Sequence, residues 1–416
     1  MIKPLSREQC DVLIIGAGPA GAVAAALLCQ QGRRVLVIER ERFPRFCIGE
    51  SLLPQCMEYL EQAGMLRAVV EAGFQFKNGA SFVHRERHAE FDFRDKFTPG
   101  WGTTYQVPRA RFDHLLAKEA ERQGAEIRYG QAVIAVEFPE ALSKQKPCVT
   151  IQSPDGQPSL IEAGFVLDAS GFGRVLPRLL DLERPSDFPV RASLFTHVED
   201  HILTGAFDRH KIRITVHPEV GSVWYWLIPF SEGRCSLGVV AEKAFLDRYP
   251  GTETERLQAL VSEAPSLQAL LGKAVWDTPA RQISGYAANV KALWGNGYAL
   301  LGNAGEFLDP VFSSGVTIAV KSAGLAAAVL ARFFAQEAVD WEQEYAIPLK
   351  VGIDTFRTFV ESWYAGGFQN IIFYENQQPE IRRMIASILA GYAWDERNPY
   401  VRESRRRLGT LEAICV

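Results

Sequence analysis

The sequence predicts an α/β protein with a nucleotide-binding domain built from separated segments, an antiparallel β-sheet domain and a helical C-terminal region. Three observations lead to this fold class. An apolar strand, a glycine-rich turn, a helix rich in alanine and a second strand follow one another at the N-terminus. Two much later strands also end in glycine-containing turns. The segments between them alternate apolar and polar residues, which is typical of half-buried strands.

These patterns give expected boundaries for the three regions. The nucleotide-binding domain is expected over 1–75, 105–185 and 285–335, the sheet domain over 76–104 and 186–284, and the helical region over 336–416. The chain of 416 residues is long enough for one large or two intertwined cores.

Composition excludes several classes of partner. The net charge of -4 and the pI near 6.1 give no reason to expect nucleic acid. Seven scattered cysteines favour a reducing compartment, and we expect a cytoplasmic protein. No signal peptide is evident, and Lys321 and Arg332 interrupt the most apolar later segment, so we expect no membrane span. Neither the histidines nor the cysteines have metal-ligand spacing, so we expect no metal site.

The first element is a βαβ unit, DVLIIGAGPAGAVAAALLCQQGRRVLVIER. Gly16 permits the tight turn after the strand, and Gly18, close to Ala20, lets backbone N–H groups approach a pyrophosphate. Gly21 lets helix and strand pack closely, and Glu39 ends the second strand, where an acid accepts both hydroxyls of a ribose. The unit therefore predicts dinucleotide binding.

Two later segments indicate which dinucleotide. They are FVLDASGFGR (165–174) and YALLGNAGEFLDPVFSSGVTIAVKSA (298–323). Together with the βαβ unit, this layout resembles the discontinuous, Rossmann-like FAD-binding fold of aromatic hydroxylases and flavin-dependent halogenases. The resemblance implies that Asp168 and Asn303 lie beside FAD. That family usually has Gly-Asp in the later turn, whereas this chain has Gly302-Asn303, which hydrogen-bonds without charge.

The segment YQVPRARFDHLLAKEAERQGAEIRYG (105–130) is similar to the same family. A basic residue, Arg109 or Arg111, stands before a helix with apolar residues at helical spacing. The resemblance implies a flavin contact for Arg109, and a salt bridge at the helix start is the alternative.

Four further motifs resemble the halogenase branch of this fold. They are RFPRFCIGESLLP (42–54), GFQFKNGASF (73–82), WYWLIP (224–229) and DPVFSSG (309–315). The resemblance places the flavin beside the first and last motifs and so implies flavin contacts by Gly49, Glu50, Ser51, Pro310 and Gly315.

In this branch, reduced FAD and oxygen convert chloride or bromide to hypohalous acid. The resemblance implies halide binding by Ser313, Ser314 and Gly315, where free N–H groups at a helix N-terminus favour an anion. A plain helix cap is the alternative. Lys77 is implied as the catalytic amine that positions the acid, against the alternative of an ordinary surface lysine. Trp224 and Trp226 are implied to keep the substrate away from the flavin, and burial in a core strand is the alternative.

Phe312 stands where halogenases of free tryptophan have a glutamate. The resemblance therefore implies an electron-rich phenol or pyrrole, either free or tethered to a carrier protein, and it leaves the catalytic base unplaced. Because only one dinucleotide motif is present, we expect a partner flavin reductase to supply reduced FAD. A monooxygenase of the same fold, acting on an aromatic or a peptidyl tryptophan, and a non-catalytic flavin-binding assembly partner remain the alternatives.

Overall fold

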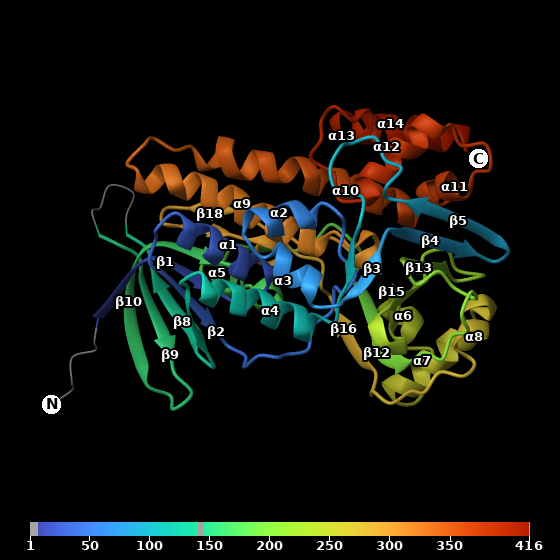
Figure 1. Cartoon of the computed structure of the whole chain (residues 1–416), viewed down its shortest axis with the longest axis horizontal. Coiled ribbons are helices and arrows are strands. Elements are labelled where there is room, and N and C mark those ends of the chain that lie inside the picture. The colour runs from blue at the N-terminus through green and yellow to red at the C-terminus, as the bar shows by residue number, and fades with distance from the viewer. Residues whose placement is uncertain (1–6, 140–144, 416) are drawn as a thin grey trace.

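The computed structural model describes residues 7–139 and 145–415, and its strands form two large sheets (Figure 1). The first sheet has eight strands in the order β18-β19-β10-β1-β2-β7, with β9 and β8 added to β10. Its strands are β1 (Arg7–Ile15), β2 (Val35–Glu39), β7 (Glu126–Tyr129), β8 (Ala132–Glu137), β9 (Cys148–Gln152), β10 (Pro158–Asp168), β18 (Trp294–Gly295) and β19 (Tyr298–Leu300).

The central strands of this sheet are parallel and end in register. Ile15 pairs with Ile38 and Asp168, and Asp168 pairs with Leu300. The chain therefore leaves four strands along one edge of the sheet, where α/β folds bind ligands. Helices α1 (Pro19–Gln30), α4 (Arg109–Arg122) and α9 (Gly315–Phe334) pack beside one another against this sheet. The short helices are α2 (Cys56–Gln62), α3 (Leu66–Glu71) and α5 (Val175–Leu179).

The second sheet has seven strands in the order β16-β12-β15-β14-β13-β4-β5. They are β4 (Gly79–His84), β5 (Arg87–Asp92), β12 (Arg191–Glu199), β13 (Lys211–Val216), β14 (Trp224–Pro229), β15 (Arg234–Glu242) and β16 (Arg281–Ser284). The expectation of a purely antiparallel sheet is wrong in one place, because β13 and β4 run parallel. These two strands come from distant segments, and a chain that returns to a sheet after a long excursion can pair in either direction.

Each face of the second sheet has its own core. Trp224, Trp226 and Ile228 of β14 face the core shared with the first sheet, whereas Tyr225 and Leu227 face a smaller core. That smaller core is covered by α6 (Lys243–Leu246), α7 (Glu253–Ser262) and α8 (Pro265–Leu271). Both faces of this strand are apolar and buried, so the burial in a core strand that was offered as the alternative for Trp224 and Trp226 is observed.

Two small sheets complete the strands. One joins β3 (Gln75–Lys77) to β6 (Thr104–Gln106), and the other joins β11 (Glu183–Arg184) to β17 (Asn289–Val290). The turns around the cavity described below contain the short helices η1 (Gly171–Gly173), η3 (Gly302–Ala304) and η4 (Pro310–Phe312).

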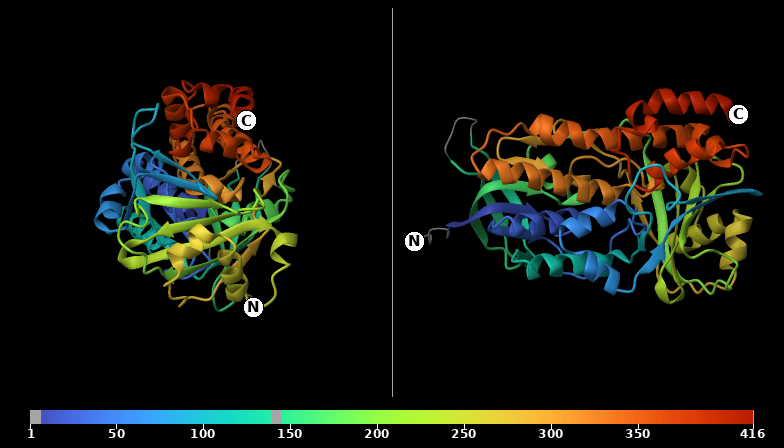
Figure 2. Two further views of the ribbon diagram at one scale, coloured as in Figure 1. Left: turned by 90° about the vertical axis from the view of Figure 1, so that its right-hand side faces the viewer. Right: turned by 45° about the horizontal axis from the view of Figure 1, so that its top comes forward.

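Helix α10 (Ile347–Ala365), which continues from the short π-helix η5 (Glu342–Ala346), packs against α9 and leads toward the end of the molecule that carries β5. The remaining C-terminal helices gather at that end (Figures 1 and 2, red), and they are α11 (Gly367–Phe373), α12 (Pro379–Leu389), α13 (Pro399–Arg402) and α14 (Ser404–Ile414). The aromatic residues Phe356, Phe359, Trp363 and Phe368 are fully buried and form part of the core of this region.

Helix α9 is long and apolar enough to cross a membrane by length and composition alone. In this structure it packs against α1, α2 and α10, and more than half of its apolar stretch is buried inside the protein. The α/β fold class is confirmed, while the expected domain boundaries stay a prediction.

Candidate active site

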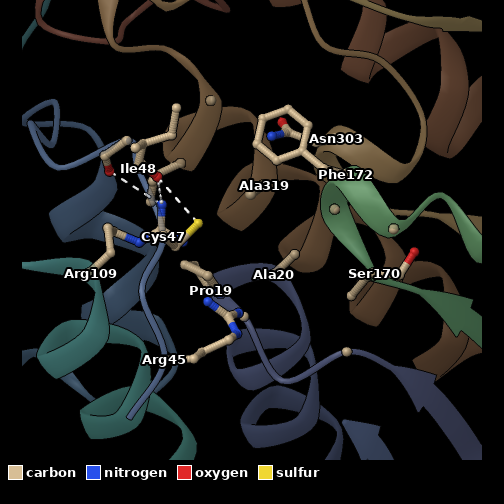
Figure 3. A pocket seen from close by; sticks show the side chains of 18 of the residues that line it. Pro19, Ala20, Arg45, Cys47, Ile48, Arg109, Ser170, Phe172, Asn303 and Ala319 are labelled. Atoms are coloured by element: carbon tan, nitrogen blue, oxygen red, sulfur yellow. Dashed lines mark hydrogen bonds between the residues drawn. The ribbon is translucent and has the colours of Figure 1, made fainter. Parts of the chain in front are cut away.

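A cavity of about 760 Å³ lies where the parallel strands of the first sheet end and the second sheet begins (Figure 3). The turns after β1, β2, β10 and β19 line it from one side, and β14 and β16 line it from the other. The expected site residues in its wall are Gly16, Gly18, Ala20, Glu39, Gly49, Glu50, Ser51, Arg109, Trp224, Trp226, Asn303, Pro310, Ser313 and Gly315. Gly21, Lys77, Asp168 and Ser314 do not line it.

The first turn has the geometry of a pyrophosphate cradle. Gly16 has a φ of 96°, a conformation that favours glycine. A Cβ on Gly21 would stand 1.9 Å from the carbonyl oxygen of Gly16, so only glycine lets α1 approach the turn this closely. The α1 N-terminus, capped by Gly18 without a side chain, opens toward the cavity and favours an anion there.

Glu39 is fixed by backbone donors at the end of β2. Its Oε2 accepts a 2.8 Å hydrogen bond from the Ala17 N–H, and its Oε1 accepts another of 2.8 Å from the Glu41 N–H. The carboxylate is 5% exposed and lines the cavity, so its remaining lone pairs are available to ribose hydroxyls.

Asp168 lies behind the cavity wall and fixes the turn that follows β10. Its two oxygens accept hydrogen bonds from the N–H groups of Ser170 (2.8 Å) and Leu176 (2.6 Å), and burial raises the pKa of this carboxyl group. It thereby shapes the turn whose Ser170 and Phe172 line the cavity opposite Arg45 (Figure 3). Asn303 lies in the wall beside them.

The segment from Gly49 to Ser51 is held against the cavity by β6 and α4. The Glu50 carbonyl accepts a 2.7 Å hydrogen bond from the Val107 N–H, and Arg109 donates to the Ile48 carbonyl at 2.8 Å. Arg109 also forms a two-bond ion pair with Asp113.

Of the two arginines proposed from the sequence, Arg109 faces the cavity. Arg111 instead donates to the Ala72 carbonyl and does not line the cavity. Arg109 is therefore both a cavity residue and half of a salt bridge at the helix start, so the two interpretations offered by the sequence describe the same side chain.

The carboxylate of Glu50 pairs with a histidine that sequence reasoning missed. His197 Nε2 lies 2.7 Å from Glu50 Oε1, and both side chains are largely buried. Nothing in the spacing of the histidines marks His197, because the pair joins β12 to a loop that is distant in sequence. Arg45 was also missed; it lines the cavity and pairs with Asp113.

The loop before α9 presents backbone to the cavity. Asp309 caps it by accepting a 3.0 Å hydrogen bond from the Val311 N–H. Ser313 has a φ of 56°, an uncommon conformation for a residue with a side chain, and it lines the cavity with Gly315. Ser314 is the N-cap of α9, yet its side chain caps no N–H group. The 20-residue helix therefore directs its positive end at this wall.

Lys77 lies one residue behind the wall. It is fully buried, and its Nζ donates hydrogen bonds of 2.7 Å to Ser51 Oγ and to the Leu52 carbonyl. Burial lowers the pKa of the amine to about 7. The alternative of a surface lysine is excluded, and contact with the cavity runs through Ser51, which lines it.

Two tryptophans of β14 form part of the opposite wall. Trp224 Nε1 donates to Tyr364 Oη at 2.9 Å, and Trp226 Nε1 donates to Ser236 Oγ at 3.1 Å. Gly238 lies across the ladder from Trp226, whose ring covers it closely. Both indoles are therefore held in place by hydrogen bonds and packing.

These features fit FAD. The tight glycine turn, the helix N-terminus and Glu39 suit an adenosine diphosphate moiety, and the cavity extends from them to the loops at Glu50 and Ser313. Within residues 7–139 and 145–415, no cluster of side chains is suited to a metal ion.

Comparisons with known proteins agree with this geometry. The FAD binding domain family matches residues 9–341. A 1H-pyrrole-2-carbonyl peptidyl-carrier-protein chlorinase of Pseudomonas fluorescens is 28% identical over 438 aligned positions, covering 97% of this chain and 94% of that protein. A tryptophan 2-halogenase of Chondromyces crocatus is 29% identical and is covered over 62% of its length.

Solved structures of flavoproteins also resemble this chain in fold and in sequence. A flavoprotein/dehydrogenase of Cytophaga hutchinsonii is 43% identical, with a TM-score of 0.94 over 98% of this chain and 99% of that one. A triple mutant of the flavin-dependent brominase Bmp2 is 25% identical, with a TM-score of 0.82 over 96% of this chain and 100% of that one. The chain therefore belongs to the FAD binding domain family, and it is similar over nearly its whole length to flavin-dependent halogenases.

Proposed function

We propose that this FAD-dependent oxidoreductase halogenates an electron-rich aromatic molecule, a phenol or a pyrrole, with chloride or bromide. The observation that carries the proposal is the single cavity that joins the dinucleotide cradle at Gly16 to the Glu50 loop, the tryptophans of β14 and the α9 N-terminus. FAD, when reduced and bound, supplies the oxygen activation that turns a halide ion into hypohalous acid.

The protein's own groups have three tasks in this reaction. The Ser313–Gly315 backbone at the positive end of α9 holds the halide, since free N–H groups and the helix dipole both favour an anion. Trp224 and Trp226 keep a bulky aromatic substrate away from the flavin, whereas hypohalous acid is small enough to pass them. The acid then exchanges one ring hydrogen for halogen and releases water.

Lys77 positions the hypohalous acid. With a pKa of about 7, the amine exchanges a proton near neutral pH, so it can either donate a hydrogen bond or act as a neutral nitrogen. Its Nζ donates a hydrogen bond to Ser51 Oγ, and Ser51 lines the cavity. Hypohalous acid formed at the flavin would therefore reach Lys77 by passing Ser51.

The substrate class follows from the residue before Ser313. Phe312 is buried and contacts Trp363 and Phe368, so no carboxylate is available there to stabilise a cationic ring. A phenol or pyrrole needs less help because its heteroatom donates electrons to the ring. The relative that acts on a pyrrole attached to a carrier protein supports this class, with the substrate either free or carrier-tethered.

The partner that supplies reduced FAD is proposed to be a separate flavin reductase. Only the βαβ unit beginning at β1 has the glycine pattern of a dinucleotide site, so a nicotinamide domain is not expected. We place the enzyme in the cytoplasm, where thiols such as the buried, free Cys10, Cys56 and Cys235 stay reduced.

The test supplies the protein with reduced FAD, oxygen and bromide, together with a reactive phenol or pyrrole, and measures product mass. Addition of bromine supports the proposal. Lys77→Met should lower the bromination rate at least about 100-fold while FAD binding is retained, because the group that positions the acid is gone. Normal product yield from this variant would show that Lys77 has no catalytic role.

A monooxygenase of the same fold is the second candidate. It is favoured by one observation, that Lys77 is fully buried and separated from the cavity by Ser51. In the same assay this activity adds one oxygen and needs no bromide. FAD binding without either product would instead support the non-catalytic flavin-binding partner.

A further inference from the structure

A group of polar side chains lies next to residues of the cavity wall without lining the cavity itself. We call it the Arg191 cluster, and it consists of Arg191 and Ser193 of β12, Tyr286, Asp309 and Tyr364 of α10. All except Tyr364 are at least nine-tenths buried. No motif in the sequence marks this group, because its members are up to 173 positions apart.

Three members have hydrogen-bonding atoms without partners. Arg191 is 6% exposed, and within residues 7–139 and 145–415 its guanidinium makes no hydrogen bond or ion pair. It stacks on the Tyr364 ring, 3.3 Å from the ring centroid. Ser193 Oγ and Tyr286 Oη lie close enough to interact with each other, but among the described residues neither has any other hydrogen-bond partner.

Such groups are costly unless a ligand or water satisfies them. A buried donor left unpaired costs about 1–3 kcal/mol, and a charged donor costs more. Arginine has five N–H donors in a planar fork. A fold that places this unpaired fork near the Ser193 and Tyr286 hydroxyls therefore offers several donors to an acceptor with more than one oxygen atom.

Asp309 does not use these donors. Its carboxylate accepts hydrogen bonds from the Val311 N–H and from Tyr364 Oη, and Tyr364 in turn accepts one from the Trp224 indole. Burial raises the pKa of Asp309 to about 6, although the positive charge of Arg191 opposes that rise. Asp309 thus offsets the charge of Arg191 without satisfying its N–H groups.

We propose that the Arg191 cluster binds the carboxylate of a free aromatic acid. The edge formed by Nε and one Nη of a guanidinium matches the two oxygens of a carboxylate. The hydroxyls of Ser193 and Tyr286 can donate to the same oxygens. A halide ion has no second oxygen for this edge, so a carboxylate satisfies the site better.

The ring of such an acid would lie beside the cavity. Trp224, which donates to Tyr364, and Phe307, which contacts Tyr286, both line the cavity wall. This inference rests on the proposed function and narrows it. A substrate tethered to a carrier as a thioester has no carboxylate, so the site selects the free acid.

The test measures binding to the oxidised, FAD-loaded protein by titration calorimetry, without turnover. The probes are 4-hydroxybenzoate and pyrrole-2-carboxylate, each compared with its methyl ester, which stands in for a thioester. We expect each acid to bind at least about tenfold more tightly than its ester. Arg191→Met should weaken the acids at least about tenfold and leave the esters unchanged, since a charge-assisted pair is lost.

Arg213→Met is the matched control, because Arg213 of β13 is a half-buried arginine that does not line the cavity and forms no ion pair with the described residues. It should leave acid affinity unchanged. If Arg191→Met does not fold, the double variant Ser193→Ala/Tyr286→Phe removes two donors with little change in volume and should weaken the acids severalfold. Thermal unfolding and FAD titration check each variant.

Four results would overturn the proposal. They are equal affinity for acid and ester, no binding of either acid at millimolar concentration, loss of acid binding in Arg213→Met instead of Arg191→Met, and displacement of the acids by low-millimolar chloride, which would identify a halide site. The experiment measures binding and no product. Its outcome therefore does not depend on whether the protein halogenates a substrate.

Discussion

At the residue scale, burial determines the chemistry of Lys77. The amine has no solvent contact, and among the described residues its only hydrogen-bond acceptors are Ser51 Oγ and the Leu52 carbonyl. Removing its positive charge from water is unfavourable, which lowers its pKa from 10.5 to about 7. The same side chain on a surface would be almost entirely protonated at neutral pH, so the neutral amine would be scarce.

This shift makes the stability of the fold depend on pH. The folded pKa lies near 7 and the unfolded one near 10.5, so between these values the unfolded chain binds more protons. Stability should therefore rise with pH in that window, by up to about 1.4 kcal/mol per pH unit from this group.

Lys77→Met should remove this contribution. Urea denaturation at several pH values from 7 to 10 measures it, as the difference in slope between the variant and the wild type. Lys273→Met, at an exposed lysine, should keep the wild-type slope. Equal slopes in all three proteins would mean that Lys77 is not held in the low-pKa state.

At the element scale, the bulky side chains of β14 need small residues in the neighbouring strand β15. Trp226 packs over Gly238 of β15, and a Cβ at that glycine would stand 2.3 Å from the indole. The large residue on one strand thus needs the smallest one on its neighbour. This pairing lets the indole lie flat against the sheet and contribute to the cavity wall.

Gly238→Ala should accordingly destabilise the protein by about 1–3 kcal/mol, because the indole must leave its position. Urea denaturation gives the change in free energy of unfolding. In a Trp226→Leu background the same substitution should cost much less, and a cost that is unchanged in that background would contradict the pairing.

Substitutions in β14 test whether its tryptophans keep the aromatic substrate away from the flavin. Trp226→Ala opens space between the cavity and the second sheet, so an aromatic substrate should reach the flavin and become hydroxylated. Mass spectrometry of the product detects the added oxygen. Trp226→Phe keeps most of the wall and should give little of it, and a stable Trp226→Ala variant with no oxygenated product would favour a purely structural role.

At the scale of the whole molecule, the cavity is a junction where segments from distant parts of the chain meet. Its walls come from both large sheets, from the α9 N-terminus and from the loop at Glu50, and the Glu50–His197 pair ties that loop to β12. A ligand that fills the junction contacts segments that otherwise meet through few polar groups. FAD should therefore stabilise the whole fold.

Thermal unfolding should show this. FAD at 100 times its Kd adds about 2.7 kcal/mol to the free energy of unfolding and should raise Tm by several degrees. Glu39→Ala should reduce the effect of FAD, because Glu39 is placed to bind the adenosine ribose. FMN, which lacks that ribose, should stabilise both proteins equally. A Tm that is independent of FAD would contradict the assigned cavity.

The sequence by itself determined the elements and their class. The glycine turn at Gly16, the end of β2 at Glu39 and the alternation of β14 are local patterns, because turn conformation and strand periodicity depend on adjacent residues. The α/β fold and some of the residues that line the cavity, such as Gly16, Glu39 and Gly315, were predicted on this basis and on family resemblance, whereas Arg45 was not.

Only the tertiary structure decided how side chains from distant segments meet. It placed Lys77 behind Ser51, paired Glu50 with His197, turned β13 parallel to β4 and gathered the Arg191 cluster. These contacts span up to hundreds of residues, and no local propensity encodes them. They follow from the packing of two sheets and a helix around one cavity, which sets burial, and burial in turn sets charge and hydrogen bonding.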